Sequence, residues 1–118
     1  MAKAEKKSLD SPDETRKFEK GKVEIVNLSD GAFGRFLFEP GWKWSEHVKP
    51  IAGTELCQAP HHSFQIAGRL HVVMADGSEF EVGPGEVAII PPGHDAWVVG
   101  DEAVTGVDWA GMANYAKK

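Results

Sequence analysis

The sequence predicts an all-β domain, either a sandwich or a barrel. Short segments of alternating apolar and polar residues recur from residue 22 to residue 109, and turns that contain Gly or Pro separate them. Outside the first 20 residues, no window shows sustained helical periodicity. Many short strands at even spacing, joined by such turns, are typical of all-β sandwiches and barrels.

The expected strands follow directly from this alternation. They lie, in order, at 22–28, 32–39, 42–44, 62–67, 69–75, 78–82, 86–90, 97–99 and 104–109. Pro40-Gly41 and Pro91-Pro92-Gly93 are expected to turn the chain between strands. The segment 48–59 contains Pro50 and Gly53, and it is expected to form a long loop.

Asp76-Gly77 is the clearest turn signal in the chain. This dipeptide lies between two alternating segments, which is the usual pattern of a tight β-hairpin. In the second of these segments, Phe80 and Val82 alternate with two glutamates. We therefore expect Phe80 and Val82 to lie in the core.

The first 20 residues form a polar segment rich in Lys and Glu. Within it, Ser11 can cap a helix, Pro12 suits the first helical position, and Glu14 can bond back to the capping amide. A short helix of one or two turns is expected there. The predicted organisation is thus a polar segment at 1–20, a β-barrel at 21–110 and a tail at 111–118.

Composition limits the partners and the compartment of the protein. A chain of 118 residues fits one domain. The net charge of −5 argues against nucleic acid or an anionic membrane as a partner, because phosphate binding needs concentrated Lys and Arg. Cys57 is the only cysteine, so no intramolecular disulfide can form. No apolar run is long enough to span a bilayer, and the charged N-terminus is unlike a secretory signal, so a cytoplasmic protein is expected.

Two segments together resemble the signature motifs of the cupin superfamily. They are PHHSFQIAGRL at 60–70 and GPGEVAIIPPGH at 83–94. This resemblance implies a double-stranded β-helix, or jelly-roll barrel, which often binds a divalent metal and often forms a homodimer.

The ligand positions of the first cupin motif depart from the usual pattern. Counting back from Gly68, His61 stands where the family has Glu, Cys57 stands where it has the second His, and Glu55 replaces the first His. An alternative alignment counts forward from Gly41, places His47 at the first-His position and treats 48–56 as an insertion. We prefer this mixed alignment, in which Cys57 and His61 keep their positions from Gly68.

The second motif keeps its frame but not its ligand. Gly85, Pro91 and Gly93 match the family pattern, but Ala96 occupies the position of the usual His. His94 lies two residues earlier, on the loop that the resemblance places at the barrel mouth.

The candidate metal ligands are Cys57, His61, His47 and His94. One sulfur with up to three imidazoles suits a divalent transition metal such as Zn, Fe, Ni, Cu or Mn better than Mg²⁺ or Ca²⁺. The candidate pocket-lining residues are Gln65, Trp44, Trp97 and Glu55.

Each candidate ligand also has a purely structural interpretation. Cys57 can be a small buried side chain, which is the usual state of a free cysteine. His94 can be a turn histidine bonded to backbone, and His47 a strand-end residue. Because His61 and His62 are adjacent on a strand, they must face opposite ways, and the family spacing favours His61 as the inward residue.

Three functions fit these features. The first is a metal-dependent oxygenase, isomerase or lyase that acts on a small molecule. The second is a non-catalytic module that binds or senses a small molecule or a metal. The third is a metal-free dimerisation scaffold. The fold does not choose among them.

Overall fold

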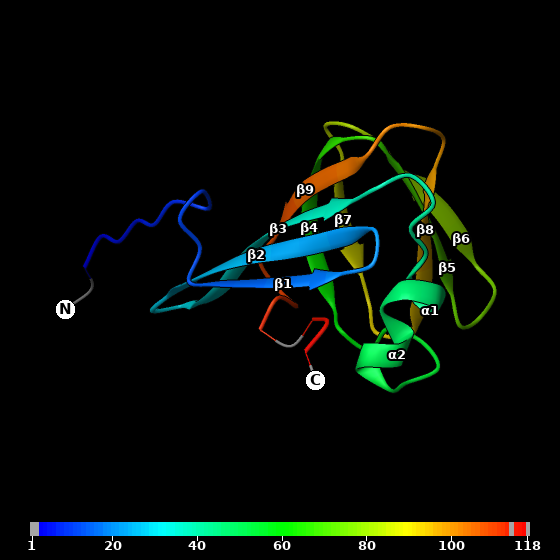
Figure 1. The fold of residues 1–118 in the computed structure, drawn as a ribbon, viewed down its shortest axis with the longest axis horizontal. Coiled ribbons are helices and arrows are strands. Elements are labelled where there is room, and N and C mark those ends of the chain that lie inside the picture. The colour runs from blue at the N-terminus through cyan, green and yellow to red at the C-terminus, as the bar shows by residue number, and fades with distance from the viewer. Residues whose placement is uncertain (1–2, 114, 118) are drawn as a thin grey trace.

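Two antiparallel sheets form the domain in the computed structural model, which describes residues 3–113 and 115–117. The larger sheet has the strand order β1-β2-β3-β9-β4-β7, and the smaller has the order β6-β5-β8 (Figure 1). The strands are β1 (Glu14–Phe18), β2 (Gly21–Leu28), β3 (Gly31–Phe38), β4 (His61–Ala67), β5 (Arg69–Met74), β6 (Glu79–Val82), β7 (Val87–Ile90), β8 (His94–Val99) and β9 (Val104–Asp108). Two short helices, α1 (Trp44–His47) and α2 (Lys49–Ala52), lie between β3 and β4.

The inner face of the large sheet is aromatic where β3 meets the following turn. Phe36 stacks on Phe38 with ring centroids 5.3 Å apart, and Phe38 stacks on Trp42 at 3.9 Å. Val23 and Ile25 of β2 are also buried, as their alternation predicts. These side chains form one wall of the core.

The small sheet supplies the facing wall. Leu70 of β5 lies opposite Val82 of β6 on one side and Val98 of β8 on the other, and all three are buried. The Asp76-Gly77 turn is a tight hairpin, as predicted: Met74 exchanges backbone hydrogen bonds with Gly77 and Ser78.

Phe80 is not a core residue, although Val82 is. Phe80 pairs with Val72, which is fully buried, so the two share the inner face of the sheet. However, β6 is an edge strand and does not pair with β7, and a groove between them leaves Phe80 38% exposed. The alternation therefore predicts correctly which face of the sheet Phe80 lies on, but it does not show that the side chain stays partly exposed there.

Gly68 passes the chain from one sheet to the other. It has φ +79°, and a Cβ there would collide with the backbone of Ala103 and Val104. β4 therefore ends in the large sheet and β5 begins in the small one after a single residue.

The short helix predicted near Ser11 is wrong. Residues Glu14–Phe18 form strand β1, which pairs along its whole length with β2. Asp13 accepts a hydrogen bond from the backbone N–H of Asn27, so the segment enters the sheet instead of capping a helix. Pairing with a neighbouring strand overrides the local capping pattern. Residues 3–12 extend away from the barrel (Figure 1).

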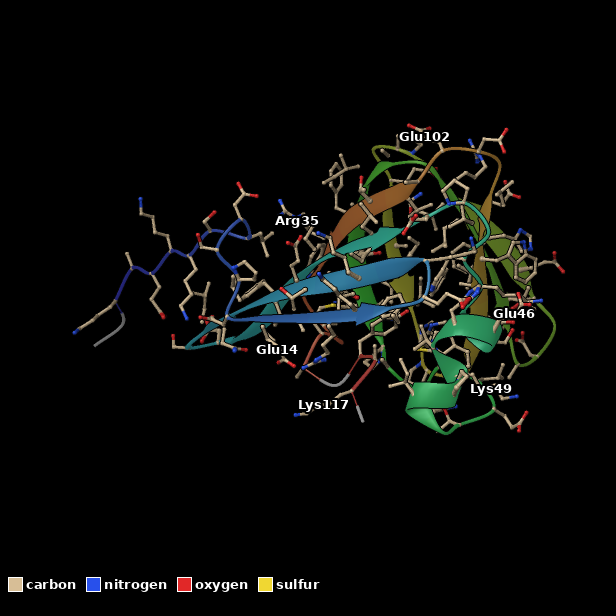
Figure 2. The ribbon with its side chains drawn as sticks, viewed as in Figure 1. Glu14, Arg35, Glu46, Lys49, Glu102 and Lys117 are labelled. Atoms are coloured by element: carbon tan, nitrogen blue, oxygen red, sulfur yellow. The ribbon has the colours of Figure 1, made fainter. Side chains whose placement is uncertain are left out.

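The segment 48–59 is a loop that starts with one helical turn. α2 has a proline in its first turn and ends at Gly53, which adopts φ 76°. Figure 2 shows the labelled side chains Glu46 and Lys49 on the two helices, at the periphery of the molecule. In the part of the chain that the structure describes, neither helix is long and apolar enough to cross a membrane.

Candidate metal centre

Strand β4 turns polar side chains into the barrel. His61, Ser63 and Gln65 are all buried, and they alternate with the exposed His62, Phe64 and Ile66. His61 and His62 therefore face opposite ways, as predicted, and His61 is the inward residue. Burying polar groups requires hydrogen-bond partners, and two of these three show theirs.

Cys57 lies beside His94 because their backbones pair. They form an isolated antiparallel bridge in which the Cys57 N–H donates to the His94 carbonyl at 2.8 Å. Cys57 Sγ lies 3.8 Å from Nε2 of His61. Within the described residues, Cys57, His61 and His94 form a buried group whose potential ligand atoms all lie within 4.8 Å of one another.

Both imidazoles are oriented through Nδ1. His61 Nδ1–H donates to Oδ2 of Asp108, a carboxylate that is itself buried. His94 Nδ1–H donates to the carbonyl of Pro91 at 2.8 Å. These bonds leave the Nε2 lone pair of each ring available, and a metal-binding histidine is typically held in this way.

Opposite charges develop on Cys57 and His61. Burial raises the pKa of Cys57, but hydrogen bonds from His61 and His94 outweigh burial and lower it to about 6. Burial lowers the pKa of His61, but Asp108 and then Cys57 raise it to about 9. Without a metal, the pair is therefore a thiolate beside an imidazolium at neutral pH.

A cavity of about 40 Å³ adjoins this group. His61, His94, Asp108 and Ser63 supply its polar side. The rest of its lining is mainly apolar and aromatic, and consists of Phe36, Phe38, Trp42, Trp44, Leu70, Ile90, Ala96, Met112 and Tyr115. The volume suits water or a small ligand group.

Two of the lining residues carry buried donors without a partner. The indole Nε1 atoms of Trp42 and Trp44 make no hydrogen bond to the described part of the chain. Such orphan donors are costly, so they commonly bond to water or to a bound ligand.

The C-terminal tail closes the cavity. Met112 and Tyr115 are buried, and the Tyr115 ring lies edge-on to His61 with centroids 5.4 Å apart. Burial, then the charges of Cys57 and Asp108, raise the pKa of Tyr115 well above its ordinary value. The phenol therefore stays protonated beside the site.

Arg16 and Asp108 hold the tail in place. Arg16 of β1 donates to the carbonyls of Met112, Ala113 and Tyr115 at 3.0, 3.1 and 2.6 Å. Oδ1 of Asp108 accepts from the N–H of Ala110 at 2.9 Å. Asp108 thus connects the tail with His61: Oδ1 binds the tail and Oδ2 binds the imidazole.

The remaining predicted site residues lie elsewhere or act differently. His47 Nδ1 accepts from the Lys43 N–H and its Nε2 lies 3.2 Å from Glu19, so the structure does not bring His47 to the group. Glu55 is exposed and pairs with Lys49. The alignment from Gly41 therefore selected a residue outside the cluster.

Of the other predicted pocket-lining residues, Gln65, Trp44 and Trp97, the structure places only Trp44 in the cavity lining. Gln65 is buried but donates to the carbonyls of Gly68 and Val82, both at 2.7 Å, so it ties the two sheets together. Trp44 lines the cavity. Trp97 instead stacks on His71, outside the cavity.

Sequence reasoning missed Asp108, Met112 and Tyr115. Asp108 shares the inward phase of β9 with the buried Val104 and Gly106. A carboxylate on the buried face of a strand is unusual enough to mark a site. Tyr115 had no such signal, because it lies beyond the last strand.

Comparison with known proteins identifies the fold. No protein-family model matches the sequence, and no curated protein matches it either. Among solved structures, a protein of unknown function from Rhizobium leguminosarum matches with a TM-score of 0.59 at 21% identity, over 93% of this chain and 99% of that one. A cupin-2 domain from Rhodospirillum rubrum matches with a TM-score of 0.57 at 19% identity, over 94% and 67% of the two chains.

An oxalate decarboxylase from Lactobacillus farciminis matches with a TM-score of 0.62 at 17% identity. The match covers 94% of this chain but only 34% of that enzyme. Two antiparallel sheets, the Gly68 crossing and these structural matches agree with the jelly roll that the sequence motifs imply. The chain therefore has the fold of a small cupin domain, with a possible Cys/His/His metal-binding group at its centre.

Proposed function

We propose that this protein holds a divalent transition metal through Cys57, His61 and His94. The observation that carries the proposal is the convergence of one buried thiolate and two oriented imidazoles. This donor set suits Zn, Fe, Ni or Cu, and Mn less well, because thiolate is a soft ligand.

The spacing fits tetrahedral coordination. Zn–S and Zn–N bonds of about 2.3 and 2.0–2.1 Å imply a sulfur–nitrogen separation of roughly 3.6 Å around a tetrahedral ion. The separation between Cys57 Sγ and His61 Nε2 is 3.8 Å. Asp108 and the Pro91 carbonyl supply the outer hydrogen bonds that metal-bound histidines usually make.

Three protein ligands leave one position open, which is the pattern of catalytic metal sites. The adjoining cavity is small and largely aromatic, so it favours a small substrate with an apolar part. When bound there, a metal would act as a Lewis acid or activate O₂, which is the chemistry of an oxygenase, isomerase or lyase. The tail would exclude water, and the protonated Tyr115 could donate a hydrogen bond.

A second candidate function rests on a different observation. The imidazolium of His61 lies between the thiolate of Cys57, on its Nε2 side, and the carboxylate of Asp108, on its Nδ1 side. Without metal, this is the arrangement of an activated cysteine nucleophile with its base and orienting acid. The same three residues would then act on an electrophilic carbon instead of binding an ion.

The test begins with protein purified without a metal-affinity tag, followed by elemental analysis. Melting curves with Zn²⁺, Ni²⁺, Fe²⁺ and Mn²⁺ at pH 7.5 should show a metal-linked rise in Tm, because an ion that binds only the folded state stabilises it. Cys57→Ser and His94→Ala should abolish the rise. His47→Ala is the matched control, because it removes an imidazole from the chain but not from the cluster.

The outcomes separate the two functions. Stoichiometric metal with a Tm rise that depends on Cys57 supports the metal site, and a turnover screen of the loaded protein then separates an enzyme from a binding module. Absence of metal and of any Tm shift would refute the metal site. Rapid alkylation of Cys57 at pH 7 in that metal-free protein would favour the nucleophile.

A further inference from the structure

A second and larger pocket lies outside the barrel cavity, between two segments that belong to none of the strands. It has a volume of about 450 Å³, whereas the barrel cavity has about 40 Å³. One wall is formed mainly by residues 48–60, and the other is the C-terminal tail. Figure 1 shows both segments at the same end of the molecule. We refer to this space, whose volume is in the range of sites for small organic molecules, as the outer pocket.

Small side chains create the room in the outer pocket. Gly111 lets the two walls meet, because a Cβ there would collide with the carbonyl oxygen of Pro60. Beside this contact, five of the lining residues are alanines, whose side chains end at Cβ. They are Ala52, Ala59, Ala110, Ala113 and Ala116. Larger side chains in these walls are therefore expected to fill the pocket.

The outer pocket borders the candidate metal centre. Trp44 and Tyr115 line both the outer pocket and the barrel cavity, so they form the partition between them. Of these two spaces, Cys57 lines only the outer pocket, whereas His61 and His94 line only the barrel cavity. A molecule in the outer pocket therefore lies on the Cys57 side of the cluster, with the two imidazoles beyond it.

The charged and the unsatisfied polar groups of the outer pocket are donors. Lys117 is the only charged residue among the described residues that line it. The buried indole N–H of Trp44 has no hydrogen-bond partner in the described chain, and the raised pKa of Tyr115 keeps its phenol protonated. In a chain of net charge −5, a pocket lined by a cation and by no carboxylate favours a negatively charged ligand.

Lys117 lies exposed at the rim of the outer pocket. Figure 2 shows Lys117 and Glu14 at the same edge of the molecule, but the Glu14 carboxylate is bonded to Arg16. Arg16 is also the main cause of the lowered pKa of Glu14, and the charge of Lys117 is only its last cause. The ammonium group of Lys117 therefore remains available to a ligand.

We infer that the outer pocket binds a small carboxylate with an apolar, ring-sized body. The body would pack against Trp44, Val48 and the alanines, while the carboxylate would pair with Lys117. Such a ligand is held beside Cys57 whether this residue binds a metal or acts as a nucleophile. The inference therefore adds a ligand class to either proposed function and depends on neither.

The test is an NMR titration of the ¹⁵N-labelled full chain with benzoate, phenylacetate and indole-3-acetate. EDTA is present, so that no metal can bind the carboxylate. At least one of these probes should saturably shift the indole N–H resonance of Trp44, which the variant Trp44→Phe identifies. The resonance of Trp97, which lines neither space, should not move. Benzylamine and phenethylamine carry the same ring with the opposite charge, and they should bind on the order of tenfold more weakly than benzoate and phenylacetate.

Four variants locate the binding. Ala52→Leu and Ala110→Leu place larger side chains in opposite walls, and each should weaken binding on the order of tenfold. Both positions are exposed, so neither change disturbs the core. Ala75→Leu, at an exposed alanine beside the Asp76-Gly77 turn, is the matched control and should bind like wild type. Lys117→Gln should weaken the carboxylates by roughly threefold to tenfold without weakening the amines.

Circular dichroism should show that all four variants are folded. The inference is overturned if none of the three carboxylates binds, if both filled variants keep the affinity of wild type, or if the amines bind as tightly as the carboxylates. Elemental analysis of the metal content is a separate measurement. A failure of this test therefore leaves the metal site standing, and an absence of metal leaves the outer pocket standing.

Discussion

The two ends of the large sheet follow opposite rules. On β2, Val23 and Ile25 are buried, while Lys22 and Glu24 face solvent with Arg35 of β3 beside them. On β4, the buried residues are polar, and two of the three exposed ones, Phe64 and Ile66, are apolar. The inward residues of β2 are therefore ordinary core residues, whereas the inward row of β4 contributes His61 to the candidate metal group.

The inversion is tolerated because two of the three buried polar side chains have hydrogen-bond partners. His61 bonds to Asp108, and Gln65 donates to the carbonyls of Gly68 and Val82. Buried groups satisfied in this way cost little, whereas leaving one partner unpaired costs the full desolvation penalty.

The largest expected difference in stability is between alanine substitutions of two phenylalanines, one inward and one outward. Phe38→Ala removes an inward ring from the conventional end and should cost about 3–5 kcal/mol of unfolding free energy. Phe64→Ala removes an outward, partly exposed ring from the inverted end and should cost well under half of that. Denaturant unfolding of both variants checks this. Equal losses would show that the outer face of β4 is buried within one chain.

Gln65→Leu tests the buried polar row itself. It preserves volume but leaves the carbonyls of Gly68 and Val82 without their donor, so it should cost about 1–3 kcal/mol. Gln58→Leu, at an exposed position in the loop before β4, is the control and should stay close to wild type. A neutral or stabilised Gln65→Leu would mean that the inversion has no energetic role.

Asp108→Asn should weaken the proposed metal site without removing a ligand. An outer-shell substitution of this kind typically reduces metal affinity 10–100-fold. Asp101→Asn, in the exposed turn before β9, should leave the affinity unchanged. Competition with a chromogenic chelator measures both. An unchanged affinity in Asp108→Asn would show that the carboxylate does not orient a ligand.

The pH dependence of the metal-free protein follows from two opposite shifts. The pKa of His61 is raised from 6.5 to about 9, so its contribution to stability is complete below pH 6.5 and is lost as the pH rises through 9. The pKa of Cys57 is lowered from 9.0 to about 6, so its contribution is complete above pH 9 and is lost as the pH falls through 6. Between pH 6.5 and 9, these slopes oppose each other and largely cancel.

Cys57→Ala should reveal the pH dependence of stability that is due to His61 alone. Asp108 still raises the pKa of His61, so the stability of this variant in chelator should fall as the pH rises from 6.5 toward 9, while wild type changes little. Urea unfolding at several pH values provides the measurement. Parallel profiles for the two proteins would contradict the thiolate–imidazolium pair.

The smallest loss of stability is expected for a charged residue on the outer face of β2. Glu24→Gln breaks ion pairs with Arg35 and Lys22 on the outer face and should cost less than about 1 kcal/mol. The loss should shrink further in high salt, because salt screens exposed charges. A loss as large as that of Gln65→Leu would remove the contrast between the two ends.

Local pattern was enough to predict most strands, the Asp76-Gly77 hairpin and an all-β sandwich or barrel, and the resemblance of the two motif segments implied the jelly roll. Alternation reveals which side chains share a face, but not whether anything covers that face, and Phe80 shows the difference. Cys57, His61 and His94 could be named as candidates because His61 and His94 lie on the motif segments and Cys57 is placed by its spacing from Gly68. The alternation of β9 could mark Asp108 as an inward carboxylate, but not its partner, because it meets His61 across 47 residues of sequence and only the β4–β9 pairing brings them together.

The hydrogen bonds from Arg16 to the C-terminal tail tie the lining of the cavity to the far edge of the large sheet. They join residues up to 99 apart in sequence. Tyr115 lines the cavity, and Arg16 lies on the edge strand β1. An opening that frees β1 from the sheet therefore also removes the donor that holds the tail beside the candidate site.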